Sequence, residues 1–128
     1  MRFRKKQPGK EKTMAGIGNY HFGEIEVDGK KYKGDIKIIG GSVISNWWRN
    51  EGHELAVSDV EDILSDAPEV LVVGKGLPGR MQVTGELRRR LAETGVSLIE
   101  EPTPEAAKKF NSLSKSGKKV DGAFHLTC

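Results

Sequence analysis

The sequence predicts a single α/β domain with an N-terminal β-hairpin followed by strand–helix–strand–helix–strand. The chain has 128 residues, the length of one domain, and its 36% hydrophobic and 30% charged residues are typical of globular proteins. From residue 70 onward, short apolar runs alternate with segments of helical periodicity. This alternation indicates a sheet with parallel strand pairs and crossover helices. We expect residues 1–18 to form a basic, disordered tail and residues 19–128 to form the domain.

The hairpin is expected over residues 20–39. Asp28-Gly29 is a strong signal for a two-residue hairpin turn. A turn at this dipeptide places Ile25 opposite Tyr32 on one face and opposite charges on the other face. This pairing of the two strands therefore gives the hairpin one buried face and one solvated face.

Three helices are expected after the hairpin, each with its own start and stop signals. Ser58, Thr84 and Thr103 are the expected N-caps. Gly95 and Gly117 are the expected ends of the second and third helices. The intervening strands are expected at residues 70–73, 96–99 and 120–126.

The net charge of +3 comes from the tail. Residues 1–12 hold six basic side chains and one acid, so the rest of the chain has fifteen basic and seventeen acidic residues. A nucleic-acid-binding arm is the functional interpretation of this tail, and a solvated extension is the alternative. We favour the extension because only Phe3 interleaves the charges, whereas stacking on bases needs aromatic residues.

Cysteine usage and hydropathy indicate a cytoplasmic protein. Cys128 is the one cysteine, so no internal disulfide is expected. No apolar run approaches the ~20 residues that a membrane-spanning helix needs. We therefore expect no membrane association.

Residues 74–79 read Gly-Lys-Gly-Leu-Pro-Gly, which matches the G-x-G-x-x-G pattern between a strand and a helix. In dinucleotide-binding proteins this pattern places a pyrophosphate on the N-terminus of the helix. Here Pro78 interrupts the motif, and the best helix cap, Thr84, comes five residues after the motif ends. We therefore do not expect a dinucleotide, and we expect no cofactor.

A milder hypothesis concerns the same loop. Gly74 and Gly76 would allow the backbone to approach a ligand, and Lys75 and Arg80 would supply positive charge. These four residues are candidate ligand-binding residues for an anionic small molecule. The alternative is a flexible surface loop with two solvated cations.

Two adjacent tryptophans are the second functional signal. Trp47 and Trp48 are expected on a strand, where neighbouring side chains face opposite ways, so one indole should be in the core and the other partly exposed. An exposed tryptophan beside Arg49 is typical of protein interfaces. With His53 in the following turn, these residues are the candidate interaction surface. The alternative is that both indoles close the edge of the core, with Arg49 stacked on one of them.

Catalytic and metal-binding motifs are not evident. His21, His53 and His125 are far apart, and none has a ligand partner at a recognisable spacing. No serine lies in a nucleophile elbow, and no P-loop is present. We therefore predict no catalytic residue and no metal site, and favour a protein that is not an enzyme.

Several short motifs occur in the order found in one small family. They are Trp48-Arg49, Gly52-His53, residues 70–76, residues 105–113 and residues 124–128. Over about residues 20–128 the chain resembles the family that includes an adipogenesis-associated domain protein and an assembly factor of mitochondrial respiratory complex I. The resemblance implies a three-layer α/β fold with a central mixed sheet, whose last strand runs antiparallel to most others. It implies no accepted enzymatic activity and no established cofactor.

These observations favour a non-enzymatic protein-interaction or assembly module with an unknown protein partner. The alternative is a small-molecule binder, or a minor enzyme, that holds an anionic ligand at Gly74-Lys75-Gly76. Nucleic-acid binding ranks last because the body of the chain is slightly acidic.

Overall fold

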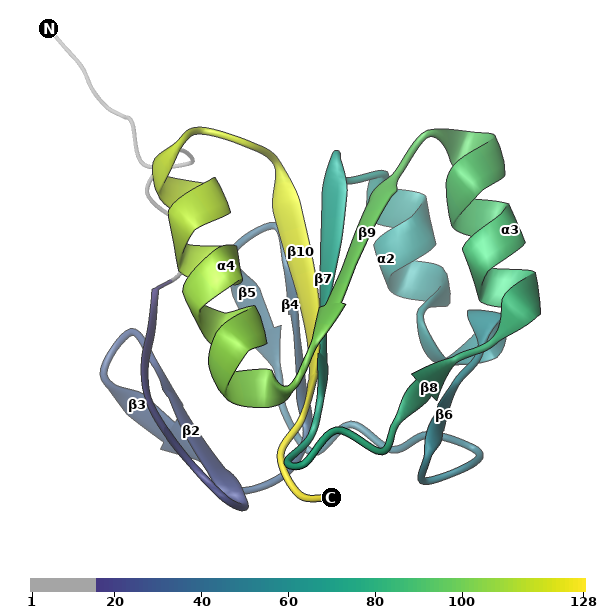
Figure 1. The fold of residues 1–128 in the computed structure, drawn as a ribbon. Coiled ribbons are helices and arrows are strands. Elements are labelled where there is room, and N and C mark those ends of the chain that lie inside the picture. Colours follow the sequence, from purple (N-terminus) through teal and green to yellow (C-terminus); the bar gives the residue numbers. More distant parts are fainter. Residues whose placement is uncertain (1–15) are drawn as a thin grey trace, which may run out of the picture.

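The computed structural model describes residues 16–128. Its centre is a five-stranded mixed sheet in the order β5-β4-β10-β7-β9 (Figure 1). A three-stranded antiparallel sheet, β1-β2-β3, and a short parallel pair, β6-β8, complete the strands. The bounds are β1 (Ile17–His21), β2 (Glu24–Val27), β3 (Lys30–Tyr32), β4 (Ile36–Ile39), β5 (Ser42–Ile44), β6 (Glu54–Leu55), the 3-10 helix η1 (Val57–Asp59), α2 (Glu61–Asp66), β7 (Val70–Lys75), β8 (Gln82–Val83), α3 (Gly85–Thr94), β9 (Ser97–Glu101), α4 (Thr103–Lys115) and β10 (Val120–His125).

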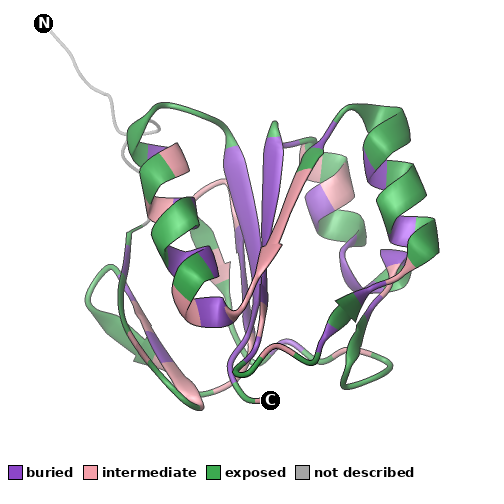
Figure 2. Ribbon diagram, in the orientation of Figure 1, coloured by how far each residue is buried: buried purple, intermediate pink, exposed green. Residues whose placement is uncertain are grey.

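The central sheet is covered on both faces, which confirms the three-layer α/β architecture. Along β7, Val70 and Val72 pack into one core with Phe110 of α4, whereas Leu71 and Val73 pack into a second core with α2 and α3. Successive side chains of a strand point to opposite faces, so a continuous apolar run is what two covered faces require. Figure 2 shows β7 and β10 as the most completely buried strands.

The predicted hairpin turn is confirmed. Asp28 and Gly29 both have positive φ, at 52° and 84°, as a two-residue turn of type I′ requires, and Ile25 pairs with Tyr32. The hairpin is shorter than expected. Residues 36–39 form β4, which leaves it and pairs with β10 in the central sheet.

The expected orientation of the last strand is wrong. β10 is parallel to β7, which is parallel to β9, and β10 is antiparallel only to its other neighbour, β4. The physical reason is the connection. α4 carries the chain from the end of β9 back across the sheet, and a helical crossover returns the next strand in the same direction.

The domain begins earlier than the predicted boundary at residue 19. Ile17 is buried in β1, and the side chain of Asn111 on α4 bonds both its N–H (2.9 Å) and its carbonyl (2.8 Å). The two-sided contact fixes the start of β1 against the domain. The expectation of a disordered basic tail otherwise concerns residues 1–15, which lie outside the described residues. Within residues 16–128, the helices are too short or too polar to cross a membrane.

Two of the predicted helix caps need correction. Thr84 caps α3 by accepting a hydrogen bond from the N–H of Leu87 (3.2 Å), and α3 ends before Gly95, as expected. Ser58 lies within η1 instead and does not cap α2. Thr103 is the first residue of α4, and its buried hydroxyl bonds other segments of the chain. A threonine before a proline is a typical helix cap in sequence, but the hydroxyl of Thr103 is already bonded to the backbone of Gly76 and His125.

Two neighbouring carboxyls, Asp66 at the end of α2 and Asp121 on β10, lie where these elements meet. Asp121 of β10 is fully buried, and one of its oxygens accepts a hydrogen bond from the N–H of Gly40 (3.1 Å). Burial first, and then the neighbouring carboxyl of Asp66, raise the pKa of Asp121 to about 7. The charged form of Asp121 is disfavoured, because its carboxylate is buried and lies beside the half-buried carboxyl of Asp66.

This pair gives a pH-dependent stability. A group whose pKa is higher in the folded state stabilises that state at low pH, and this stabilisation is lost as the pH rises through about 7. We expect the free energy of unfolding to fall by about 1.4 kcal/mol for each pH unit between the unfolded-state pKa of the carboxyl and that value. Urea denaturation at a series of pH values measures this loss, and Asp121→Asn should remove most of it. An equally steep profile in the variant would contradict the assignment.

Candidate functional site

The carboxyl end of β10 brings together three segments that are distant in the sequence. His125 is the last residue of β10, and Asp35 immediately precedes β4. Because β4 is the antiparallel neighbour of β10, with Ile36 paired to Phe124, the start of β4 lies beside the end of β10. Arg49 reaches the same place from residues 45–53, the irregular segment between β5 and β6.

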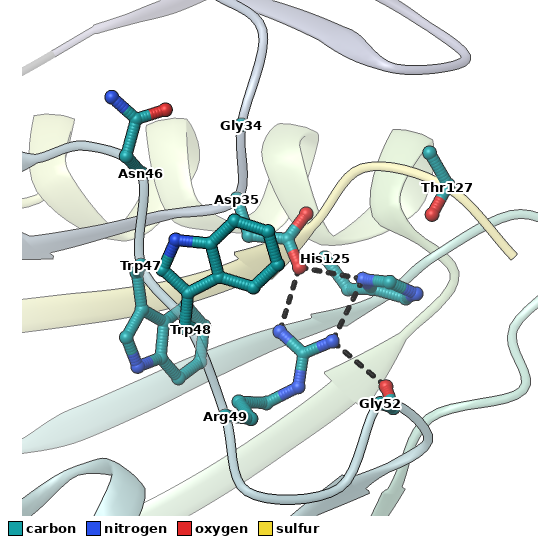
Figure 3. A pocket seen from close by; sticks show the side chains of 9 residues that line it. All are labelled: Gly34, Asp35, Asn46, Trp47, Trp48, Arg49, Gly52, His125 and Thr127. Atoms are coloured by element: carbon teal, nitrogen blue, oxygen red, sulfur yellow. Dashed lines mark hydrogen bonds and ion pairs between the residues drawn. The ribbon is translucent and has the colours of Figure 1, made fainter.

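These three side chains form a tight polar cluster (Figure 3). One carboxylate oxygen of Asp35, Oδ2, lies 2.7 Å from Nη1 of Arg49 and 2.7 Å from Nδ1 of His125. The other oxygen, Oδ1, accepts a hydrogen bond from the N–H of Leu126 (2.8 Å). Nη2 of Arg49 donates to the carbonyl of Gly52 (2.7 Å). We call Asp35, Arg49 and His125 the polar cluster.

The geometry assigns a proton to Nδ1 of His125. This nitrogen faces both the carboxylate of Asp35 and, at 3.1 Å, Nη2 of Arg49. A guanidinium only donates hydrogen bonds, and a carboxylate only accepts them. Since the shorter contact is to the carboxylate, Nδ1–H donates to Asp35, and the imidazole is held in one orientation.

The carboxylate of Asp35 is kept charged despite its burial. Burial alone would raise the pKa of Asp35, but the hydrogen bonds from His125, Arg49 and the N–H of Leu126 outweigh it and lower the pKa. The side chain of Arg49 is only 5% exposed, so its charge depends on this carboxylate for compensation. The cluster is therefore an internally balanced unit.

The polar cluster also packs on Trp47. The guanidinium carbon of Arg49 lies 5.1 Å from the centre of the Trp47 ring, and Nζ of Lys37 lies 5.3 Å from it. Lys37 is itself buried and bonds both carboxylate oxygens of Asp62 (2.8 and 2.9 Å). Cations over an indole face are attracted by its quadrupole, so Trp47 is held from two elements.

Trp48 has the opposite environment. It is 87% exposed and stands beside a cavity of about 330 Å³. Figure 3 shows the rings of Trp47 and Trp48 extending in different directions. The residues that line the cavity are Gly34, Asp35, Asn46, Trp47, Trp48, Arg49, Gly52, His125 and Thr127.

The prediction that one tryptophan is in the core and the other exposed is confirmed, although the reason differs. Residues 45–53 are not a strand, and the chain turns at Asn46, which has a φ of 53°. Arg49 stacks on the buried indole, as the alternative interpretation expected. His53 is exposed, with its ring 6.4 Å from that of His125 in an edge-to-face arrangement. The interaction surface as such stays a prediction.

The glycines of the Gly-rich loop face the protein's own chain. A Cβ on Gly74 would lie 2.8 Å from the hydroxyl of Thr103, and one on Gly76 would lie 2.1 Å from the carbonyl oxygen of Thr127. The close backbone approach that these glycines permit is therefore used by α4 and by the segment after β10. Lys75 and Arg80 do not line the cavity at Trp48. An anionic ligand at Gly74, Lys75, Gly76 and Arg80 stays a prediction.

Sequence reasoning missed Asp35 and assigned Thr103 only as a helix cap. Asp35 carries no local motif and is identified only by the pairing of β4 with β10. Thr103 links three elements, because its hydroxyl accepts from the N–H of Gly76 (2.9 Å) and donates to the carbonyl of His125 (2.6 Å).

A family model described as a protein of unknown function, DUF498/DUF598, matches residues 17–125. The chain belongs to this family. The match runs from the start of β1 to the end of β10, so it includes all three residues of the polar cluster. The expected resemblance to an uncharacterised α/β family is thereby confirmed.

Solved structures agree with this assignment. The conserved hypothetical protein PH1505 from Pyrococcus horikoshii OT3 is 28% identical, with a TM-score of 0.74 over 88% of this chain and 98% of that one. A Bordetella parapertussis protein is 28% identical, with a TM-score of 0.75 over 89% of this chain and 97% of that one. A Bordetella pertussis protein described as a Mth938-like domain is 23% identical, with a TM-score of 0.63 over 98% of this chain and 92% of that one. The DUF498/DUF598 protein therefore has a Mth938-like fold.

Proposed function

We propose that this DUF498/DUF598 protein is a non-enzymatic protein-interaction module that holds a partner protein at the Trp48 cavity. The observation that carries the proposal is a tryptophan with 87% exposure beside a cavity whose charged groups are already paired within the protein. Tryptophan is strongly enriched among the residues that dominate binding energy in protein interfaces. A partner's apolar side chain in the cavity would remove the indole of Trp48 from water.

The rigidity of the segment around Trp48 supports this role. The N–H of Trp47 donates to the carbonyl of Asp35 (2.9 Å), and the side chain of Arg49 is bonded to Asp35 and Gly52. Trp48 is therefore displayed between two anchored residues. Pre-organisation lowers the cost of ordering an interface, which is about 0.5–1.5 kcal/mol for each immobilised side chain.

The state of His125 also favours binding over catalysis. Its Nδ1 is committed to Asp35, and its Nε2 is buried from solvent with no hydrogen-bond partner within residues 16–128. A general acid or base must come within hydrogen-bond reach of its substrate. His125 lines the cavity, but its Nε2 is covered by protein, so the imidazole supports the fold of the site and presents no free nitrogen to the cavity.

Replacing Trp48 with alanine tests the proposal. We expect the affinity for the partner to fall by about 2 kcal/mol or more, roughly thirtyfold, with little change in thermal stability because the indole is exposed. Partners are first captured with the wild-type chain from cells that express it, then purified, and their affinities are measured by calorimetry.

Ile44→Ala is the matched control, since Ile44 is another exposed large apolar residue, on β5. It should leave the affinity within a factor of about two. Partners that bind the wild type and Trp48→Ala equally well would contradict the proposal.

A further inference from the structure

We infer that the partner also occupies a second cavity, across the C-terminal segment from Trp48, with an apolar side chain that lies next to a carboxylate. This inference rests on the proposed function, because it assigns the chemistry of the same partner. It identifies the partner segment as one that combines a bulky apolar residue with an acidic group.

The second cavity measures about 340 Å³ and is built mainly from apolar groups. Phe22, in the turn between β1 and β2, is 59% exposed, and Leu77, after β7, is 40% exposed. Tyr20 also lines the cavity, and its hydroxyl is turned inward to donate to the carbonyl of Leu126 (2.7 Å). Phe22 and Leu77 thus expose apolar surface at one cavity, and contiguous exposed apolar surface is typical of binding sites.

The two cavities lie on opposite sides of the C-terminal segment, which forms part of the wall between them. Thr127 lines the Trp48 cavity, and its carbonyl accepts a hydrogen bond from the N–H of Leu77 (2.9 Å), which lines the second one. The carbonyl of Leu126 is bonded by the N–H of Gly23 (2.8 Å), next to Phe22. Figure 1 shows the C-terminus between the β1–β2 turn and the segment after β7. One extended segment of a partner therefore reaches both cavities by crossing Thr127.

The charge of the second cavity selects a carboxylate. Its lining includes Lys108 and His21 and, among the residues that the structure describes, no acidic side chain. Pro104 and Lys108 are four residues apart on α4, so they share the helix face that borders the cavity. The next residue, Lys109, pairs with Glu101 at 2.7 Å, but across residues 16–128 Lys108 makes no ion pair. Lys108 also borders a neighbouring cavity with Glu101 and Glu105, but neither carboxylate forms an ion pair with it. Its ammonium group is therefore open to an anionic group of the partner.

The probe for the second cavity is hydrocinnamate, which has a phenyl ring and a carboxylate on a short chain. We expect amide proton–nitrogen correlation spectra to show saturable shifts near Phe22, Leu77 and Lys108. Neutral hydrocinnamide should bind about two- to fivefold more weakly, as expected for one exposed ion pair. Lys108→Glu should abolish the preference for the acid. Lys115→Glu, the same charge change in the last turn of α4, should preserve it.

Failure of this inference differs from failure of the proposed function. Hydrocinnamate binding should persist in Trp48→Ala, because Trp48 does not line the second cavity. Equal binding of the acid and the amide, or no saturable shift, would overturn the inference. So would a Trp48-dependent partner whose affinity is the same for the wild type, Leu77→Ser and Lys108→Glu, and in that case the proposed function would stand. A partner weakened at least tenfold by both Leu77→Ser and Trp48→Ala would support the two together.

Discussion

Replacing Asp35 with alanine is expected to lower the free energy of unfolding by about 3–5 kcal/mol, the usual effect of leaving a buried charge without its partner. The carboxylate of Asp35 compensates the buried guanidinium of Arg49, holds the imidazole of His125 and accepts the N–H of Leu126. The variant loses all three contacts at once. Urea denaturation measures the loss, and Glu51→Ala, at an exposed position in the same segment, is the control that should stay within about 0.5 kcal/mol of the wild type.

The same carboxylate contributes a pH dependence of known sign. Because the folded state lowers the pKa of Asp35, its stabilisation is present above the unfolded-state pKa and is lost as the pH falls through the lower, folded-state value. The stability difference between the wild type and Asp35→Ala should therefore shrink in acid. If Asp35→Ala were as stable as Glu51→Ala at neutral pH, the stabilising role of the polar cluster would be contradicted.

Replacing Gly76 with alanine is the second substitution with a large expected effect. A Cβ at this position would lie 2.1 Å from the carbonyl oxygen of Thr127 and 2.7 Å from Cδ2 of His125, and the backbone φ is +92°. Backbone strain costs about 1–2 kcal/mol, and overpacking adds about 1–3 kcal/mol. We expect a combined loss of about 3 kcal/mol or more by thermal or urea unfolding.

Gly95→Ala separates these two contributions. Gly95 has a φ of +78°, but nothing lies within 4 Å of its added Cβ among the described residues, so only the backbone strain remains. Its expected loss is about 1–2 kcal/mol. Equal losses for the two variants would mean that the C-terminal segment moves aside without cost, and would contradict the close packing of Thr127 on the Gly-rich loop.

The features predicted well from the sequence are those set by neighbouring residues. Asp28-Gly29 defines its turn through the φ values that the turn requires, and Thr84 caps α3 from three residues away. The polar cluster has no such local signal, because Asp35 and His125 are 90 positions apart and meet only through the pairing of β4 with β10. The direction of β10 likewise depends on the crossover through α4.

The Gly-rich loop shows that a motif can signal a close contact without identifying the contacting group. Glycine at positions 74 and 76 signals that some group approaches the backbone closely, but it does not identify the group. Here the approaching groups are Thr103 and Thr127 of the same chain. The tryptophan pair was more informative: the expected alternation of environments was found, although the turn at Asn46 and not a strand produces it.

Iodide quenching of tryptophan fluorescence tests the central claim most directly. In the free protein, iodide should quench the exposed Trp48 and leave the buried Trp47 protected. With a captured and purified partner at saturation, the account expects the quenchable component to disappear, because the indole of Trp48 becomes buried in the interface. A saturated complex in which Trp48 remains as accessible to iodide as in the free protein would contradict the assignment of Trp48 as the anchor of the interface.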